Sequence, residues 1–170
     1  MIIYEYTNKM YIARQDLRQI RRIIVADYRE TVDYILGIPL FAQKIGKENL
    51  SSLLCRLGNP EKAIPAVHVA GTNGKGSTCR ALAQMLTGMG YRVGLFTSPH
   101  LVSINERIQI DGENISDADF VWAFETVKEK FTQHPSFFEV MFAMAAVYFR
   151  EKKCEVGNVR NGDCEVILLK

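Results

Sequence analysis

A glycine-rich stretch, HVAGTNGKGSTCR at residues 68–80, contains the residue types that bind phosphate. Backbone amides of such a loop, with the unpaired amides that open the following helix, form a nest for phosphate oxygens, and the helix dipole adds partial positive charge. Glycine is needed where the backbone approaches a ligand closely or takes a positive φ, lysine reaches the terminal phosphates, and a hydroxyl faces magnesium. The residues that fit these demands are Gly71, Gly74, Gly76, Lys75, and either Ser77 or Thr78.

The spacing in this loop differs from the usual phosphate-binding pattern, in which lysine directly precedes Ser or Thr. Here Gly76 lies between Lys75 and Ser77. The alternative interpretation is a flexible linker that happens to contain a lysine. Strand-like residues before the loop and a helical pattern after it favour nucleotide binding, although they do not identify a reaction.

Two strands and a helix are predicted around the loop. The apolar, β-branched run before it predicts a buried strand at about 65–70. The segment after it predicts a helix that ends at Gly88 or Gly90. YRVGLFTS, at 91–98, repeats the strand pattern, so the three elements form a βαβ unit with a parallel crossover. The apolar stripe of the predicted helix consists of Leu82, Met85, Leu86 and Met89.

The rest of the chain predicts more helices and two short strands. Ser116 is a candidate N-cap with Asp119 at the third helical position. Strands are expected at 107–110, turning at Asp111-Gly112, and at 164–169. With about four strands in total, fewer than is usual for a nucleotide-binding sheet, the last strand is expected at an open edge. The other helical patterns cover 30–40, 49–62 and the strongly apolar 136–152.

Composition excludes several other classes of protein. The 170 residues, 48% hydrophobic and 24% charged, are typical of a soluble domain, and a net charge of +2 is too small to indicate nucleic acid or a membrane surface. The four scattered cysteines favour reduced thiols in the cytoplasm over disulfides or zinc. No apolar run approaches the roughly 18 residues of a membrane span. The arginine-rich residues 1–26 suit an amphipathic helix. Such a helix could form a membrane or partner surface, but a solvated helix or a terminal extension is the favoured interpretation.

Two motifs, taken together, resemble those of a known family. HVAGTNGKGSTCRALAQML and GYRVGLFTSPHLVSINERIQIDGENIS are similar to segments of the folylpolyglutamate synthases and bifunctional dihydrofolate synthases of the Mur-ligase superfamily, within a resemblance that runs from about Asp27 to Cys154. The phosphate loop of that family has the same glycine between lysine and hydroxyl. The resemblance implies an α/β fold, a P-loop parallel sheet of the Mur-ligase central-domain type with flanking helices, incomplete at the C-terminus. It also implies an ATP-dependent ligase, in which a folate carboxylate is phosphorylated and the amino group of glutamate then displaces phosphate.

The same resemblance assigns site residues, with ATP and Mg²⁺ as the implied cofactors. Lys75 would also neutralise charge on the transferred phosphoryl group. The implied metal ligands are Ser77 and Ser98. The implied nucleotide contacts are Gly71, Thr72, Asn73, Gly74, Lys75, Gly76, Ser77 and Thr78. The implied pterin contacts are Lys44, Ile45, Gly46 and Lys47 in one loop, and Ser136, Phe137, Phe138 and Glu139 in another segment.

Simpler explanations stay open for several of these residues. Ser98 precedes a proline and also suits an ordinary turn. Phe137 and Phe138 suit either a flat heterocycle, with Glu139 accepting ring N–H groups, or the core at a helix start. Arg107 suits either a phosphate contact or an exposed strand start, and His100 is left without a role.

The expected partners are folate or dihydropteroate and L-glutamate, with no nucleic acid and no membrane, and the chain is expected to be a cytoplasmic monomer. Family members continue into further metal ligands and a C-terminal domain. The chain is therefore expected to be an N-terminal part, with an extension at 1–26 and part of the ATP-binding domain at 27–170. A non-catalytic nucleotide-binding fragment and a P-loop small-molecule kinase stay as alternatives. The triplet Cys-Glu-Val occurs at 154–156 and again at 164–166. An insertion, a disturbance of the reading frame or chance would each explain this repeat.

Overall fold

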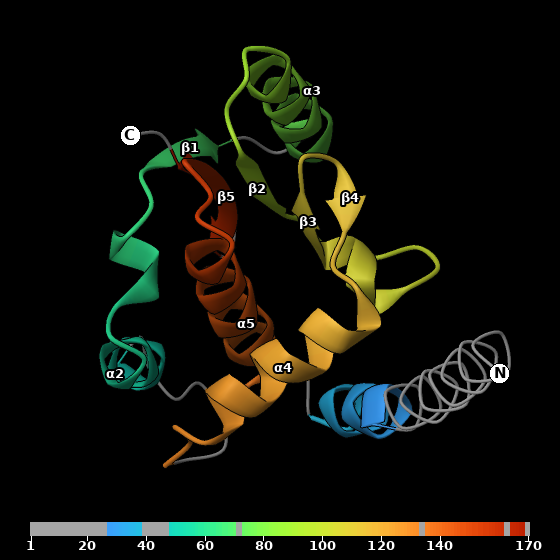
Figure 1. Cartoon of the computed structure of the whole chain (residues 1–170), viewed down its shortest axis with the longest axis vertical. Helices are drawn as coiled ribbons and strands as arrows, with labels where there is room; N and C mark the ends of the chain where they lie inside the picture. Colours follow the sequence, from blue (N-terminus) through green and yellow to red (C-terminus); the bar gives the residue numbers. More distant parts are fainter. Residues whose placement is uncertain (1–26, 39–47, 71–72, 133–134, 162–163, 169–170) are drawn as a thin grey trace, which may run out of the picture.

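The computed structural model describes residues 27–38, 48–70, 73–132, 135–161 and 164–168. Within these residues a six-stranded sheet, in the order β1-β6-β5-β2-β3-β4, has helices on both faces (Figure 1). The strands are β1 (Ala66–Ala70), β2 (Val93–Phe96), β3 (Ile108–Ile110), β4 (Glu113–Asn114), β5 (Val156–Asn161) and β6 (Cys164–Leu168). The helices are α2 (Glu48–Arg56), α3 (Lys75–Gly88), α4 (Asp117–Lys128) and α5 (Phe137–Glu151), a helix over 27–36, and the 3-10 turns η1 (Pro60–Lys62) and η2 (Ile104–Arg107).

The predicted βαβ unit is confirmed. β1 and β2 both run parallel to β5, with Ala66 opposite Gly157 and Val93 opposite Val156. The two strands are therefore parallel to each other, and α3 forms the connection between them. Because the carboxyl ends of parallel strands lie at one edge of a sheet, the segments that follow β1 and β2 leave the sheet at the same edge.

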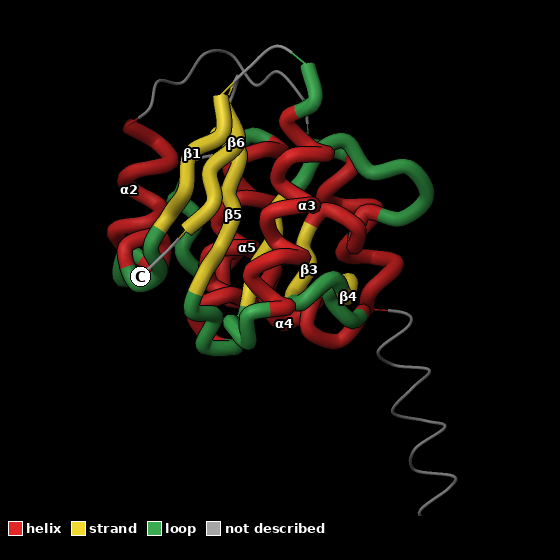
Figure 2. Tube along the Cα trace, turned by 90° about the horizontal axis from the view of Figure 1, so that it is seen from above, coloured by secondary structure: helices red, strands yellow, loops and turns green. Residues whose placement is uncertain are grey.

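The C-terminal strands differ from the prediction of four strands with the last at an open edge. The sequence of β5, VGNVRN, was not predicted because Gly and Asn are depleted in strands. Asn161 pairs with Cys164, so two residues join β5 to β6, a length typical of a tight hairpin. β6 thus lies between β5 and β1, as Figure 2 shows, and it is antiparallel to both. The edges of the described sheet are β1 and β4.

The hairpin predicted at Asp111-Gly112 is confirmed. β3 pairs antiparallel with β4, and the turn residues have φ values of 54° and 85°. Two successive positive φ angles are what a two-residue turn of this hand requires, and Asp-Gly is a favoured pair for it. The hairpin ends the sheet on the β2 side.

The larger core lies between the sheet, α4 and α5. As predicted, α5 is buried on most faces, and Ser116 caps α4 with its hydroxyl accepting from the backbone N–H of Asp119. Gly94 of β2 faces α5 so closely that an added Cβ would lie 2.7 Å from the ring of Phe149. Val93 and Leu95 belong to a smaller core under α3, because successive strand residues point to opposite faces.

The stripe predicted for α3 is wrong in part. The buried residues are Cys79, Ala83 and Leu86, whereas Met85 and Met89 are 68% and 70% exposed. The two methionines lie roughly 100° around the helix from the buried face. Small side chains at the first two buried positions let the helix approach the sheet. In the described part of the chain, no helix is long and apolar enough to cross a bilayer.

Candidate functional site

The predicted phosphate loop leads directly into α3. Gly74 is the N-cap residue, with a left-handed φ of 77° and no side-chain hydrogen bond to the helix start. A Cβ built on Gly74 meets no atom within 4 Å. Thr78 donates twice to the carbonyl of Gly74, from its backbone N–H at 2.9 Å and from its hydroxyl at 3.0 Å. Asn73 is exposed beside Gly74, while Gly71 and Thr72 lie outside the described residues.

These features fit a phosphate group. Gly74 supplies no side-chain cap to the first amides of α3, the first turn has no acidic residue, and it begins with Lys75. A helix start of this kind attracts an anion through its N–H groups and its dipole. For magnesium, the turn offers the exposed Ser77 hydroxyl, and the described residues contain no cluster of three His, Cys, Asp or Glu side chains. Magnesium bound here would take most of its ligands from phosphate and water.

A second loop follows β2 and contains the TSPHL motif, residues 97–101. The loop begins at Thr97 and ends at Arg107, and these two ends are hydrogen-bonded, because the backbone N–H of Thr97 donates to the carbonyl of Arg107 (2.9 Å). The carboxylate of Glu106 accepts from the backbone N–H groups of Leu101 (2.8 Å), Val102 (2.9 Å) and Ser103 (2.8 Å). Hydrogen bonds from these amides, those of Leu101 and Ser103 foremost, lower the pKa of Glu106. The loop is therefore held by its own carboxylate.

His100 and Arg107 meet across this loop. The Nε–H of Arg107 donates to Nδ1 of His100 at 2.7 Å, and the guanidinium carbon lies 5.0 Å from the ring centre of Phe137. Desolvation, and then the neighbouring Arg107, lower the pKa of His100, while Glu106 opposes this. Arginine has only donors, so Nδ1 must accept and the ring is neutral. The contact between Arg107 and Phe137 joins this loop to the start of α5, and nothing in the sequence indicates that these two segments meet.

The segment Ser136–Glu139 forms the start of α5. Glu139 accepts from the backbone N–H of Ser136 at 2.8 Å, and the Ser136 hydroxyl accepts in return from the N–H of Glu139 at 3.4 Å. Phe137 is buried, and Phe138 packs on Phe96 with ring centres 6.0 Å apart. The capping box and the aromatic cluster account for these side chains without a ligand. A pterin contact here stays a prediction.

The structure brings the second loop and the start of α5 together, but it leaves the phosphate loop further away. β6 and β5 lie between β1 and β2, which at about 4.8 Å per strand separates the two parallel strands by about 14 Å. Ser98, half-buried and joined to Pro99 by a cis peptide bond, follows β2, whereas Ser77 follows β1. Shared magnesium ligation by the two serines stays a prediction. The predicted pterin loop Lys44–Lys47 lies outside the described residues.

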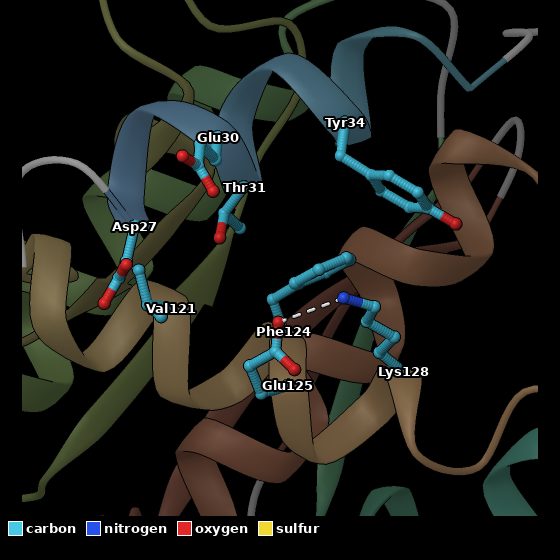
Figure 3. Close-up of a pocket in the computed structure, with 8 residues that line it drawn as sticks. All are labelled: Asp27, Glu30, Thr31, Tyr34, Val121, Phe124, Glu125 and Lys128. Carbon is cyan, nitrogen blue, oxygen red and sulfur yellow. Dashed lines mark hydrogen bonds and ion pairs between the residues drawn. The ribbon is translucent and has the colours of Figure 1, made fainter.

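Two cavities are lined by residues outside these two loops, and neither was expected from the sequence. One of about 520 Å³ lies between the helix over 27–36 and α4 (Figure 3). Lys128 pairs there with Glu125 at 3.3 Å and lies over the rings of Tyr34 and Phe124. The other, of about 260 Å³, lies between α3 and the β2–β3 strands, next to Arg80. Neither cavity is lined by a described residue of the phosphate loop, 73–78, or of the TSPHL motif, 97–101.

Comparison with known proteins identifies close relatives. The chain is 43% identical over 131 residues to a dihydrofolate synthase/folylpolyglutamate synthase of Bacillus subtilis, which covers 73% of this chain and 30% of the relative. The folylpolyglutamate synthetase structure from Lactobacillus casei is 38% identical, with a TM-score of 0.75 over 80% of this chain and 36% of that one. A folylpolyglutamate synthase structure in complex with AMPPCP and folate is 39% identical, with a TM-score of 0.75 over 79% and 35% of the two chains.

These matches cover about a third of each relative's length. A search of family models found no match. Sequence identity and fold nevertheless agree, because the same proteins match by both measures over three quarters of this chain. The chain belongs to the family of folylpolyglutamate and dihydrofolate synthases, and its sheet with flanking helices is the fold of that family.

Proposed function

We propose that this chain binds magnesium-ATP at the start of α3 and supplies part of an ATP-dependent ligase that joins L-glutamate to folate or dihydropteroate. The observation that carries the proposal is the α3 start itself. Its N-cap residue Gly74 supplies no side-chain cap, a Cβ on Gly74 would meet no atom within 4 Å in the described part of the chain, and Lys75 begins the helix. Relatives with similar sequences carry the names of these synthases, and one related structure holds AMPPCP and folate.

In the proposed reaction the γ-phosphoryl group of ATP passes to a substrate carboxylate, which forms an acyl phosphate and releases ADP. The amino group of glutamate then attacks the acyl carbon, and phosphate leaves with formation of an amide bond. Ser77 and Ser98, each from its own loop, are the proposed magnesium ligands, and bound magnesium would neutralise phosphate charge. The α3 amides would orient the phosphates, and Lys75 would stabilise charge on the transferred group.

The remaining assignments concern the substrate site and the assembly. Lys44–Lys47 and Ser136–Glu139 are the proposed pterin contacts, and the proximity of Phe137 and Phe138 to the TSPHL loop supports the second segment. We propose residues 27–170 as one nucleotide-binding unit, with 1–26 as an extension. The proposed unit of function is a monomer in the cytoplasm.

The test is a calorimetric titration of the chain with magnesium-ATP, with Lys75→Ala in parallel. We expect saturable binding that weakens about 10- to 100-fold in the variant, the effect of losing charge-assisted hydrogen bonds of about 1.5–3 kcal/mol. Thr87→Ala, at the far end of α3, is the control and should bind like the wild type. Equal binding by the wild type and Lys75→Ala, or no binding by the folded wild type, would refute the proposed site.

Product analysis separates the alternatives. Folate- and glutamate-dependent formation of ADP with a new amide indicates the ligase. ATP binding without turnover indicates a nucleotide-binding module, and a phosphorylated product without glutamate ligation indicates a kinase. The structural neighbour with bound folate favours the ligase over the kinase.

A further inference from the structure

The larger cavity is a groove between the helix over 27–36 and α4 (Figure 3). Its volume of about 520 Å³ lies in the range typical of small-molecule sites. The first helix lines it with positions 27, 30, 31 and 34, and α4 lines it with positions 121, 124, 125 and 128. Side chains three and four residues apart lie on one face of a helix, so two facing helix surfaces form the walls.

The walls of the groove are held in place by contacts of the protein itself. The hydroxyl of Tyr28 donates to Oδ1 of Asn105 at 2.6 Å, and its ring lies 5.6 Å from that of Phe120 between centres. Across the groove, the ring centres of Tyr34 and Phe124 are 5.4 Å apart. These contacts fasten the first helix to α4, so the groove exists before any ligand enters.

The groove is acidic, although the chain as a whole has a net charge of +2. Asp27, Glu30 and Glu125 bring carboxylates to it, and Lys128, which lies 3.3 Å from Glu125, balances one of them. The side chains of Asp27 and Glu30 form no ion pair or hydrogen bond with any residue that the structure describes. Two negative charges are therefore available to a cation, and attraction to the whole chain would not explain its binding.

A buried hydroxyl adds a second polar feature to the same wall. Thr31 is only 5% exposed, and Figure 3 shows its oxygen pointing toward α4. Within the described ranges this hydroxyl has no hydrogen-bond partner, whereas those of Thr78 and Thr126 donate to the carbonyl four residues earlier. A buried hydroxyl without a partner is destabilising, and such groups are normally satisfied. A ligand in the groove would supply the missing bond.

Lys128 shows how the groove accommodates an alkylammonium group. Its Nζ lies 5.7 Å and 5.4 Å from the ring centres of Tyr34 and Phe124, a cation–π arrangement, while Glu125 neutralises its charge. In the described part of the chain, no three His, Cys, Asp or Glu side chains are placed to share one metal ion. Separated carboxylates beside aromatic rings suit an elongated organic cation better than a metal.

We propose that this groove binds an aliphatic polyamine. Its ammonium groups pair with Asp27 and Glu30, one N–H donates to the hydroxyl of Thr31, and its methylene chain lies along the aromatic rings. The inference goes beyond the proposed function and does not depend on it, because neither the phosphate loop nor the TSPHL motif lines the groove.

The test is a calorimetric titration of the chain with spermidine in the absence of nucleotide. Asp27→Asn and Glu30→Gln, singly and together, remove charge with little change of shape, and Thr31→Val removes the hydroxyl. Asp33→Asn is the matched control, because Asp33 is exposed on the same helix, does not line the groove and loses the same charge. Magnesium chloride is the competing probe.

We expect saturable binding of one spermidine, weakened about threefold by each carboxylate substitution and about tenfold by the two together, the scale of exposed ion pairs. Thr31→Val should weaken binding about threefold, with the unfolding midpoint of the free chain unchanged or raised, since it removes an unpaired buried hydroxyl. Asp33→Asn should bind like the wild type, and magnesium ions at the same concentration should not displace spermidine.

Four results would overturn the inference. One is the absence of saturable spermidine binding by the folded wild type. Another is an equal loss in Asp33→Asn and Asp27→Asn, which would indicate general attraction to the helix. Equal competition by magnesium ions would show a site for any cation. Unchanged spermidine binding by Thr31→Val, with a lower unfolding midpoint, would show that the hydroxyl serves the fold alone.

Discussion

The starts of α3 and α5 are built in opposite ways. At α5, Ser136 and Glu139 exchange hydrogen bonds in a capping box, so side chains of the protein satisfy the first amides. At α3, Gly74 provides no side-chain cap and leaves open space around it. Serine also caps α4, through Ser116, and η2, through Ser103. A helix start that is filled by its own side chains serves the fold, whereas one that is left open next to a lysine is suited to an external anion.

The largest expected effect comes from a Gly→Ala substitution in β2 that faces α5, compared with a Gly→Ala substitution within α3. Gly94→Ala puts a Cβ 2.7–2.9 Å from ring carbons of Phe149 on α5, so it should lower the free energy of unfolding by about 1–3 kcal/mol. Gly88→Ala, in α3, meets no atom within 4 Å and should be neutral or stabilising by up to about 1 kcal/mol. Urea unfolding measures both values. Equal losses at the two positions would contradict the close packing of β2 on α5.

Serine-to-alanine substitutions at the two helix starts test this difference between α3 and α5 directly. Ser136→Ala should lower the free energy of unfolding by about 1 kcal/mol, because it removes the N-cap of α5. Ser77→Ala should change it by less than about 0.5 kcal/mol and should instead weaken magnesium-ATP binding. Denaturant unfolding and calorimetry on both variants provide the measurement. A stability loss at Ser77 as large as that at Ser136 would mean that α3 is not specialised for a ligand.

Acid should act on the capping box of η2. The pKa of Glu106 is lower in the folded chain than its ordinary value of 4.5, so the carboxylate stabilises the fold above that value and loses this contribution as the pH falls through the folded-state pKa. Glu106→Gln should be less stable than the wild type at neutral pH, and the difference should shrink on acidification. A thermal unfolding series over pH measures this. Glu113→Gln, on the exposed β4, is the control, and a difference that persists below the folded-state pKa would contradict the mechanism.

The smallest effect is expected for the ion pair at the start of α4. Lys152 lies 2.9 Å from Asp119, with side chains 33% and 30% exposed, so water and salt screen their attraction. Lys152→Met keeps the apolar stem and should cost about 0.5 kcal/mol or less. Unfolding at low and high salt is the measurement. A cost above about 1 kcal/mol, the loss expected when a serine N-cap is removed, would show that the ion pair contributes more than the Ser116 cap to this helix start.

Local chemistry made several elements predictable. Ser116 with Asp119 predicted the start of α4, Asp111-Gly112 predicted the β3–β4 turn, and both are confirmed. These signals depend on a few neighbouring residues, so they survive without knowledge of the fold. The phosphate loop was visible for the same reason. Its position at the start of α3 is confirmed, although its ligand stays a proposal.

Other features depended on contacts between distant segments. The exposure of Met85 and Met89, and the insertion of β6 between β1 and β5, depend on which surfaces the sheet presents. The pairing of His100 with Arg107 over Phe137 was equally invisible, because α5 supplies the ring from thirty residues further along the chain. No local pattern encodes such a contact.

The sequence by itself determined the glycine-rich loop, the serine caps and most of the helices, because those features arise from backbone preferences and hydrogen bonds within a few residues. Tertiary structure alone decided which residues of α3 are buried against the sheet and which face solvent. It also decided that β6 and β5 lie between the two strands that carry the site loops, and that Arg107 is fixed between a histidine and an aromatic ring. Those outcomes depend on packing between elements far apart in the chain, where burial and close contact outweigh local preference.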